Sequence, residues 1–164
     1  MQFTFETDYN RKTLAVLSKC LRKTEGKAKN RRYHLVGGIV LAAALLPPFN
    51  GLRWLAAPFI LLVLLFEDQM NAFFAQRQML KGTERATAVF DTDNAEFLVE
   101  TAVGKAAFPY DAILCVAETE GYFVFALSKT HGQIYDKSRL TGGTADDFRA
   151  FIGERTGKAV VPVR

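Results

Sequence analysis

The chain has 164 residues, of which 49% are hydrophobic and 23% are charged, and its formal net charge is +4. This composition excludes a disordered or fibrous chain, and the length suits one small domain with or without an anchor. The charge is uneven, because residues 1–32 carry nine Lys/Arg and three Asp/Glu, whereas residues 83–164 carry nine and twelve. The acidic C-terminal half argues against a nucleic-acid-binding domain, so no nucleic-acid partner is expected.

Residues 1–32 predict a short strand followed by a basic helix. The run Gln2–Glu6 alternates apolar and polar residues, which is the period of a strand, and Thr7 or Asp8 is placed to cap the following helix. The apolar face of that helix consists of Leu14, Leu17 and Leu21. Its basic face consists of Arg11, Lys12, Lys19, Arg22 and Lys23. This basic face has two interpretations, a solvated face of a helix packed on a protein core or a surface that lies on anionic lipid.

Residues 33–66 form an apolar centre in which only Arg53 is charged. Its two apolar segments, Tyr33–Phe49 and Leu52–Phe66, reach roughly 25 and 22 Å as helices, against about 30 Å for a hydrocarbon core. We predict a two-helix transmembrane hairpin, and whether it spans fully or is re-entrant stays open. The alternative is a helical hairpin buried in a soluble domain, which the remaining chain is too small to cover.

Residues 19–32 carry seven Lys/Arg, whereas the link between the apolar segments carries only Arg53. The positive-inside rule therefore predicts a multi-pass membrane protein with both termini in the cytoplasm. The side chains predicted to lie at the membrane interface are Lys27, Lys29, Arg31, Arg32, Tyr33, Arg53 and Trp54. Residues 67–82 are expected to continue the second helix as an amphipathic extension that ends at Gly82.

From Ala86 onward the apolar period changes to two, which predicts an antiparallel β-meander over residues 83–164. Strands are predicted at residues 86–90, 96–101, 105–108, 113–118, 122–127 and 133–135. Thr144 is expected to cap a final helix that ends at Gly157, and residues 159–163 can form a last strand. We expect Gln2–Glu6 to pair with or pack on this domain, because an isolated strand of this length is unstable in water. The predicted fold class is an α+β membrane protein divided into residues 1–32, 33–66, 67–82 and 83–164.

This order of elements resembles the YcxB-like family of small bacterial membrane proteins. The sequence runs that carry the resemblance are FPYDAILCVAETEGYFVFAL at residues 108–127, QIYDKSRLT at residues 133–141 and DDFRAFIGERTGK at residues 146–158. The resemblance implies a C-terminal domain similar to a pleckstrin-homology fold, closed by the final helix. It also implies a location in the bacterial inner membrane, and it implies no catalytic residue.

The sequence contains no recognisable catalytic or metal-binding constellation. His34 and His131 have no carboxylate or thiol at the spacing of metal ligands, and Cys20 and Cys115 lie far apart without a redox motif. We therefore expect a non-enzymatic protein with no cofactor and no metal, which presents a cytoplasmic interaction module to a protein partner. Two alternatives stay open: an immunity- or inhibitor-type protein acting on a membrane toxin or transporter, and a module that senses anionic lipid. The lipid bilayer is the other expected partner, and a homo-oligomer also stays open.

Overall fold

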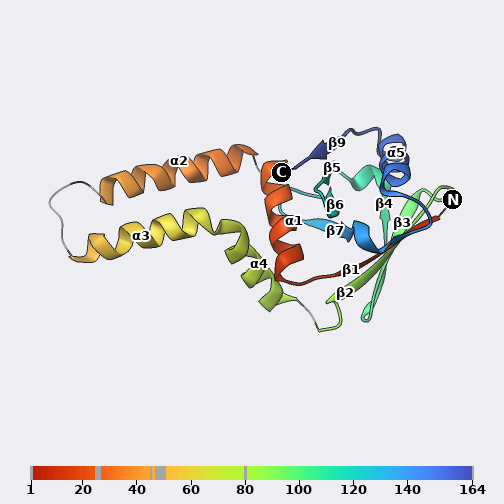
Figure 1. Ribbon diagram of the computed structural model, residues 1–164, viewed down its shortest axis with the longest axis horizontal. Coiled ribbons are helices and arrows are strands. Elements are labelled where there is room, and N and C mark those ends of the chain that lie inside the picture. The colour runs from red at the N-terminus through yellow and green to blue at the C-terminus, as the bar shows by residue number, and fades with distance from the viewer. Residues whose placement is uncertain (1, 25–26, 45, 47–50, 80, 164) are drawn as a thin grey trace.

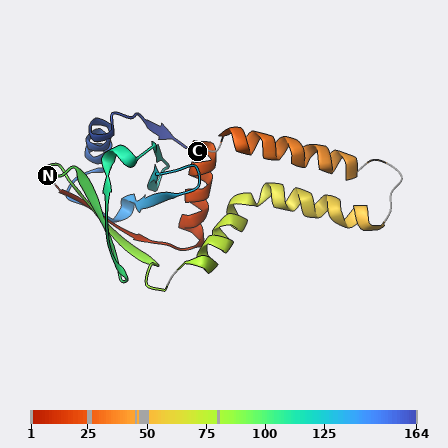
Figure 2. The same ribbon diagram turned by 180° about the vertical axis from the view of Figure 1, so that it is seen from behind.

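A computed structural model describes the chain except for residues 1, 25–26, 45, 47–50, 80 and 164, and it describes only the backbone of residues 27–29 and 51–55. Figure 1 shows two sheets with helices packed against them, and a pair of helices that projects from this body. Figure 2 shows the same arrangement from behind, with the two chain ends on the body. We use "the body" for the two sheets with helices α1 and α5, whose bounds follow below.

The first sheet has five strands in the order β4-β3-β2-β1-β8. These strands are β1 (Gln2–Asp8), β2 (Arg85–Asp91), β3 (Glu96–Thr101), β4 (Gly104–Pro109) and β8 (Leu140–Thr141). The N-terminal strand β1 pairs antiparallel with β2 along its whole length, from Gln2↔Asp91 to Asp8↔Arg85. The predicted pairing of the N-terminal strand with the C-terminal domain is therefore confirmed.

The second sheet has four strands in the order β7-β6-β5-β9. They are β5 (Cys115–Glu118), β6 (Tyr122–Ala126), β7 (Gly132–Asp136) and β9 (Val160–Pro162), and β9 runs parallel to β5. The chain changes sheets at two 3-10 turns, η1 (Tyr110–Ala112) and η2 (Lys137–Arg139). The predicted single antiparallel meander is wrong, because the strands divide between two sheets and one pairing is parallel.

Aromatic side chains fill the space between the two sheets. Alternation along β1 turns Phe3 and Phe5 inward, and both are buried. Helix α5 (Ala145–Thr156) adds Phe148, whose ring centroid lies 4.7 Å from that of Phe5 and 5.0 Å from that of Phe123. As predicted, Thr144 caps α5, and the helix ends at Gly157, whose φ of 64° is left-handed.

Helix α1 (Arg11–Lys23) covers the outer face of the second sheet. Its N-terminus is capped by Asn10, whose side chain accepts hydrogen bonds from two backbone N–H groups, and not by Thr7 or Asp8, which belong to β1. Cys20 of α1 packs with Val124 and Ile134 of the sheet in a second buried cluster. Strand β6 is therefore buried on both faces, which explains its uninterrupted apolar sequence.

Two helices, α2 (Lys27–Ala44) and α3 (Gly51–Leu65), lie side by side and project from the body (Figures 1 and 2). The predicted transmembrane hairpin is wrong. Among the described residues no single helix is both long and apolar enough to cross a membrane, and only the pair Ala56–Leu65 and Glu67–Gln78, bent by 77°, meets the criteria of length and composition together. The reason is that polar residues fill the first two turns of α2, so its apolar part from Leu35 to Ala44 is only about 15 Å long.

The second apolar helix does not continue as one straight extension. It ends at Leu65, and α4 (Glu67–Gln78) begins after a break at Phe66 with a bend of 77°. The predicted stop at Gly82 is also wrong, because α4 ends at Gln78 and Gly82 lies in the turn before β2. Helix α4 packs along α1. The chain as a whole is an α+β fold with two sheets and a projecting helical hairpin.

Candidate functional site

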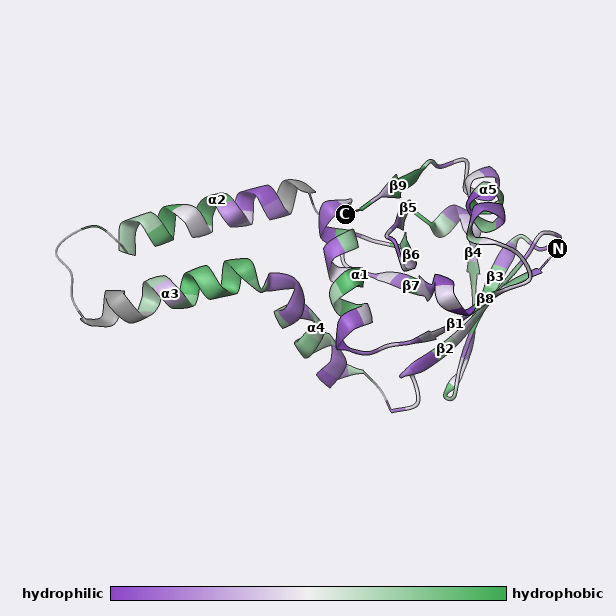
Figure 3. Cartoon of the chain, viewed as in Figure 1, coloured by the Kyte–Doolittle hydropathy of each residue, from purple (hydrophilic) through white to green (hydrophobic). Residues whose placement is uncertain are grey.

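The hairpin of α2 and α3 exposes large apolar side chains over much of its surface. Leu35, Ile39 and Phe59 are 61%, 62% and 67% exposed. We call this set the apolar hairpin surface: Leu35, Val36, Ile39, Val40, Phe59, Leu61, Leu62, Leu65 and Phe66. Figure 3 shows hydrophobic colouring in the part of α2 away from the body and over most of the described part of α3, and hydrophilic colouring in the part of α2 nearer the body. An exposed apolar surface of this kind marks a contact with a membrane or another protein.

The two hairpin helices meet each other through small residues. A Cβ added to Gly37 would lie 2.7 Å from Leu64 Cδ2, so the helices approach closely at this position. Ala57 of α3 is also buried. Gly38, by contrast, has no atom within 4 Å of an added Cβ, so it faces open space. The small residues bring the helices together, and the large apolar side chains remain outside.

The predicted interface residues lie at both ends of the hairpin. Arg31, Arg32 and Tyr33 are exposed on α2 at the end nearest the body. The side chains of Lys27, Lys29, Arg53 and Trp54 lie outside the described residues, although all four residues belong to α2 or α3. The assignment of these residues to a membrane interface stays a prediction.

Helix α4 is held against α1 by a partly buried polar contact. Arg22 of α1 donates from Nε to Asp68 Oδ1 at 3.0 Å and from a terminal nitrogen to Asp68 Oδ2 at 2.5 Å. These hydrogen bonds raise the pKa of Arg22. Ser18 donates to the same carboxylate at 3.2 Å, and Ala72 is buried between the helices. The bidentate ion pair fixes the direction in which α4 leaves the hairpin.

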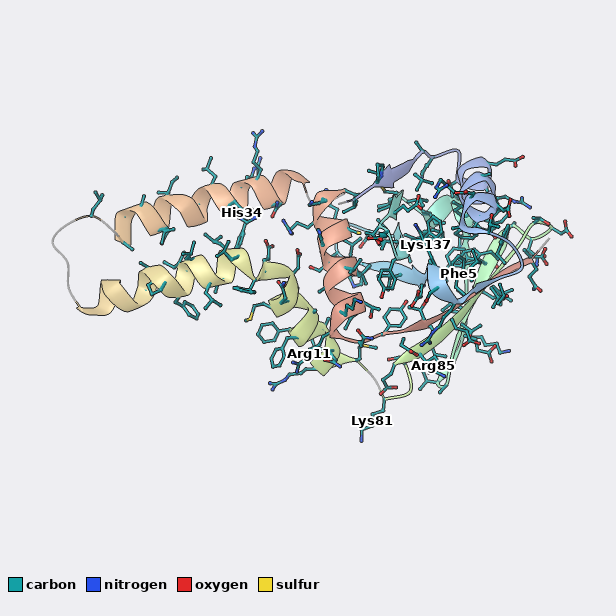
Figure 4. All side chains as sticks on the ribbon, in the orientation of Figure 1. Phe5, Arg11, His34, Lys81, Arg85 and Lys137 are labelled. Carbon is teal, nitrogen blue, oxygen red and sulfur yellow. The ribbon has the colours of Figure 1, made fainter. Side chains whose placement is uncertain are left out.

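The start of α2 also contacts α4. His34 Nε2 lies 3.6 Å from Glu67 Oε2, and Arg22 Nε lies 3.9 Å from the same oxygen. Glu67 Oε2 is buried and has no hydrogen-bond partner among the described residues. His34 therefore lies on α2 opposite the start of α4 (Figure 4).

The face of α4 that points away from α1 combines apolar and basic side chains. Met70 and Phe74 are 39% and 52% exposed on this face. Phe73 lies at the edge of this face, next to α1. Arg11 of α1 and Arg77 of α4 both stack on its ring, with guanidinium carbons 5.0 and 4.3 Å from the ring centroid. Figure 4 places Arg11 where α1 crosses α4.

A second polar cluster lies in the body. Glu118 at the end of β5 accepts hydrogen bonds from Arg149 of α5, from Nε to Oε2 and from a terminal nitrogen to Oε1, both at 2.7 Å. Lys137 also donates to Glu118 Oε1 and to Thr119 O. The hydrogen bonds from Arg149, followed by those from Lys137, lower the pKa of Glu118 to about 2. This cluster joins α5 and η2 to the second sheet and has a structural role.

The other residues considered for catalysis or metal binding make ordinary structural contacts. His131 contacts Ser128 and Thr130 within the turn between β6 and β7. Cys20 is buried, and burial raises the pKa of its thiol to about 11, so the thiol stays protonated at neutral pH. Within the part of the chain that the structure describes, no group of three His, Cys, Asp or Glu residues is placed to hold a metal ion.

Sequence reasoning missed the contact between α1 and α4. Asp68, Ala72 and Gln76 recur every four residues, which places them on one face of α4. Gln76 Oε1 accepts a hydrogen bond from Arg11 Nε at 3.0 Å. The four-residue spacing could have indicated the contact face of α4. The three residues are polar or small, however, so a search for apolar periodicity does not find this face.

These features define a class of protein, a two-sheet α+β body that carries an exposed apolar helical hairpin. Residues 93–152 match the family model described as YcxB-like protein, which confirms the resemblance over the stretch from the β2–β3 turn into α5. The strand β1, helix α1, the hairpin and α4 lie outside the matched residues. No curated protein and no solved structure matches the chain.

Proposed function

We propose that this protein attaches to a membrane from one side through the apolar hairpin surface and presents its body to a protein partner without catalysing a reaction. The exposed apolar side chains of α2 and α3 carry the proposal. Transfer of a fully exposed apolar side chain out of water contributes roughly 1.5–3 kcal/mol, and each of these partly exposed side chains contributes a part of that. A basic residue near an anionic surface contributes only about 1 kcal/mol. The hairpin therefore dominates the attachment, and the basic residues of α2 assist it.

The geometry of the hairpin favours entry without crossing. As a helix of 15 residues, α3 is about 22 Å long, which is shorter than the hydrocarbon core of about 30 Å. Strand β1 precedes the hairpin and pairs with β2, which follows it. Both ends of the hairpin must therefore lie on the same side of the membrane, with the body outside the lipid.

The edge of the first sheet is the surface of the body that best suits a protein partner. Strand β4 pairs with β3 and is the outermost strand of its sheet, so its other side offers backbone groups for strand addition. Leu98 of β3 and Val103 of the β3–β4 turn are exposed beside this edge. A photo-crosslinker at residue 103 should capture a protein from native membranes that a crosslinker at Arg155 does not capture. Equal capture from both positions would contradict this choice of surface.

Flotation of the full-length protein with lipid vesicles tests the attachment. The variant with Ile39→Glu and Phe59→Glu should stay with the unbound fraction, because two carboxylates would have to enter the lipid. The control Leu98→Glu places a carboxylate at an exposed apolar position on the body and should float like the wild type. Flotation of the hairpin variant at the wild-type level would contradict attachment through the hairpin.

A further inference from the structure

The contact between α1 and α4 gathers two cations around one aromatic ring. The guanidinium carbons of Arg11 and Arg77 lie 5.0 and 4.3 Å from the centroid of Phe73. Stacking on a ring at an exposed position contributes about 0.5–1 kcal/mol, so each guanidinium is held in place without a countercharge. Arg11 is fixed further by the hydrogen bond from its Nε to Gln76 Oε1 at 3.0 Å.

Neither arginine forms an ion pair with a carboxylate of the described residues. Among the described residues, the ion pairs formed by arginine involve Arg22, Arg85, Arg139 and Arg149. Lys12 and Lys81 add two more exposed positive charges near the ends of α1 and α4, and Figure 4 shows Lys81 just beyond α4. The guanidinium groups of Arg11 and Arg77 share one ring, so their positive charges repel one another, and an anion with several oxygen atoms would relieve the repulsion.

The direction of α4 places this cluster at the level of lipid headgroups. Helix α4 is bent by 77° from α3, so when α3 stands along the membrane normal, α4 lies close to the plane of the membrane surface. Its outer face carries the exposed Met70 and Phe74, followed one turn later by Arg77. Apolar side chains on one face with a neighbouring arginine are the pattern of a helix that lies in a membrane interface.

We propose that Arg11, Phe73 and Arg77 form a binding site for the phosphate group of an anionic lipid headgroup, with Met70 and Phe74 in the adjacent acyl region. Guanidinium groups bind phosphate through two parallel N–H···O hydrogen bonds, which a lysine cannot reproduce. The inference rests on the proposed attachment through the hairpin and adds a lipid class to it. The site gives the attached protein a preference for anionic membranes and a fixed orientation on them.

Binding of the full-length protein to vesicles of phosphatidylcholine, with and without phosphatidylglycerol, tests the site. Arg77→Gln should weaken binding to the anionic vesicles about fivefold, since one interfacial charge is worth about 1 kcal/mol. Binding to pure phosphatidylcholine should change little. Arg155→Gln is the matched control, because Arg155 also lies over an aromatic ring, 5.9 Å from the centroid of Tyr110, but on α5 in the body. It should bind like the wild type.

The conservative variant Arg77→Lys separates a phosphate site from general attraction of charge. It keeps the charge and loses the paired N–H groups, so its binding to anionic vesicles should be at least about twofold weaker than that of the wild type. Wild-type binding by Arg77→Lys or by Arg77→Gln would overturn the phosphate site and leave the hairpin attachment standing. Failure of the wild type to bind either kind of vesicle would overturn both proposals.

A soluble phosphate is the competing ligand. Inorganic phosphate offers the same oxygen atoms without lipid, so its effect on the melting temperature is measured for the wild type and for Arg77→Gln. One outcome is that phosphate raises the melting temperature of the wild type and not that of Arg77→Gln, while both proteins bind vesicles equally. That result would assign the cluster to soluble phosphate and overturn the lipid assignment. No such rise, together with weakened vesicle binding by Arg77→Gln, would support the lipid headgroup.

Discussion

Replacing Glu118 by Gln removes the charge at the centre of the cluster that joins α5 to the second sheet. The side chain of Glu118 is only 16% exposed and accepts hydrogen bonds from both Arg149 and Lys137. Glutamine keeps the size of the side chain but cannot supply two anionic oxygens. Arg149 would retain its contact with Asp146, whereas Lys137 would lose its carboxylate partner.

The magnitude follows from the pKa of Glu118, which falls from 4.5 to about 2 in the folded protein. Since one pKa unit corresponds to about 1.4 kcal/mol, the ionised carboxylate stabilises the fold by about 3 kcal/mol at neutral pH. The pKa is lowered by folding, so this stabilisation is complete above pH 4.5 and is lost as the pH falls toward 2. We expect Glu118→Gln to reduce the free energy of unfolding by about 2–3 kcal/mol at pH 7, and by progressively less below pH 4.5.

Urea unfolding in a mild nonionic detergent, followed by circular dichroism at pH 7, 4 and 3, measures this difference. Glu120→Gln is the control, because Glu120 is an exposed neighbour of the cluster, and its substitution should change the free energy of unfolding by less than about 0.5 kcal/mol. A difference between wild type and Glu118→Gln that is the same at pH 7 and pH 3 would refute the linkage to the carboxylate. A difference below about 0.5 kcal/mol at pH 7 would refute the stabilising role itself.

Three further substitutions test the fold. Asp68→Asn should cost about 1.5–3 kcal/mol in urea unfolding and speed amide exchange in α4, because Arg22 loses the carboxylate that accepts its two hydrogen bonds and keeps only the longer contact with Glu67; unchanged exchange would show that the pair does not hold α4. Phe5→Ala should cost about 3–5 kcal/mol, against less than about 0.5 kcal/mol for the exposed Phe74→Ala, and similar losses for the two would contradict the packing. Gly142→Ala should lower the melting temperature, because its φ is +88° and its Cβ would lie 1.9 Å from a β1 carbonyl oxygen; Gly38→Ala, with open space around it, should not, and equal effects would argue against that close approach.

The sequence predicted local structure well where one short-range signal decided it. The alternation of Phe3 and Phe5 marked β1, and the need to cover a short strand correctly indicated that it pairs with the C-terminal domain. The cap at Thr144 and the stop at Gly157 located α5. In these cases the residues that determine the element lie within the element or directly beside it in the sequence.

The division of strands between two sheets could not be predicted in the same way. A period of two says which side chains share a face, and it does not say which sheet a strand joins. In β6 the consecutive residues Phe123 and Val124 are both buried, so the sequence of this strand does not show the alternation of apolar and polar residues. The chain crosses between sheets at Tyr110–Ala112, in the link between the strands predicted at residues 105–108 and 113–118.

The candidate site depended on contacts between distant residues. Arg11 and Arg22 appeared on one basic face, yet Arg22 pairs with Asp68 while Arg11 stacks on Phe73. The bend at Phe66 directs α4 onto α1 and makes these contacts possible. No pattern within α1 alone distinguishes a paired arginine from an unpaired one.

The central claim is that the hairpin enters the lipid from one side without crossing it. A fluorophore attached to Leu46→Cys near the hairpin tip, in full-length protein bound to sealed vesicles, should be quenched by nitroxides on the lipid acyl chains and protected from a soluble quencher on either side. The same fluorophore at Lys105→Cys on β4 should remain accessible to the outer quencher. Access to the residue 46 probe from the vesicle lumen would mean that the hairpin crosses, and access from the outer solution would mean that it never enters the lipid.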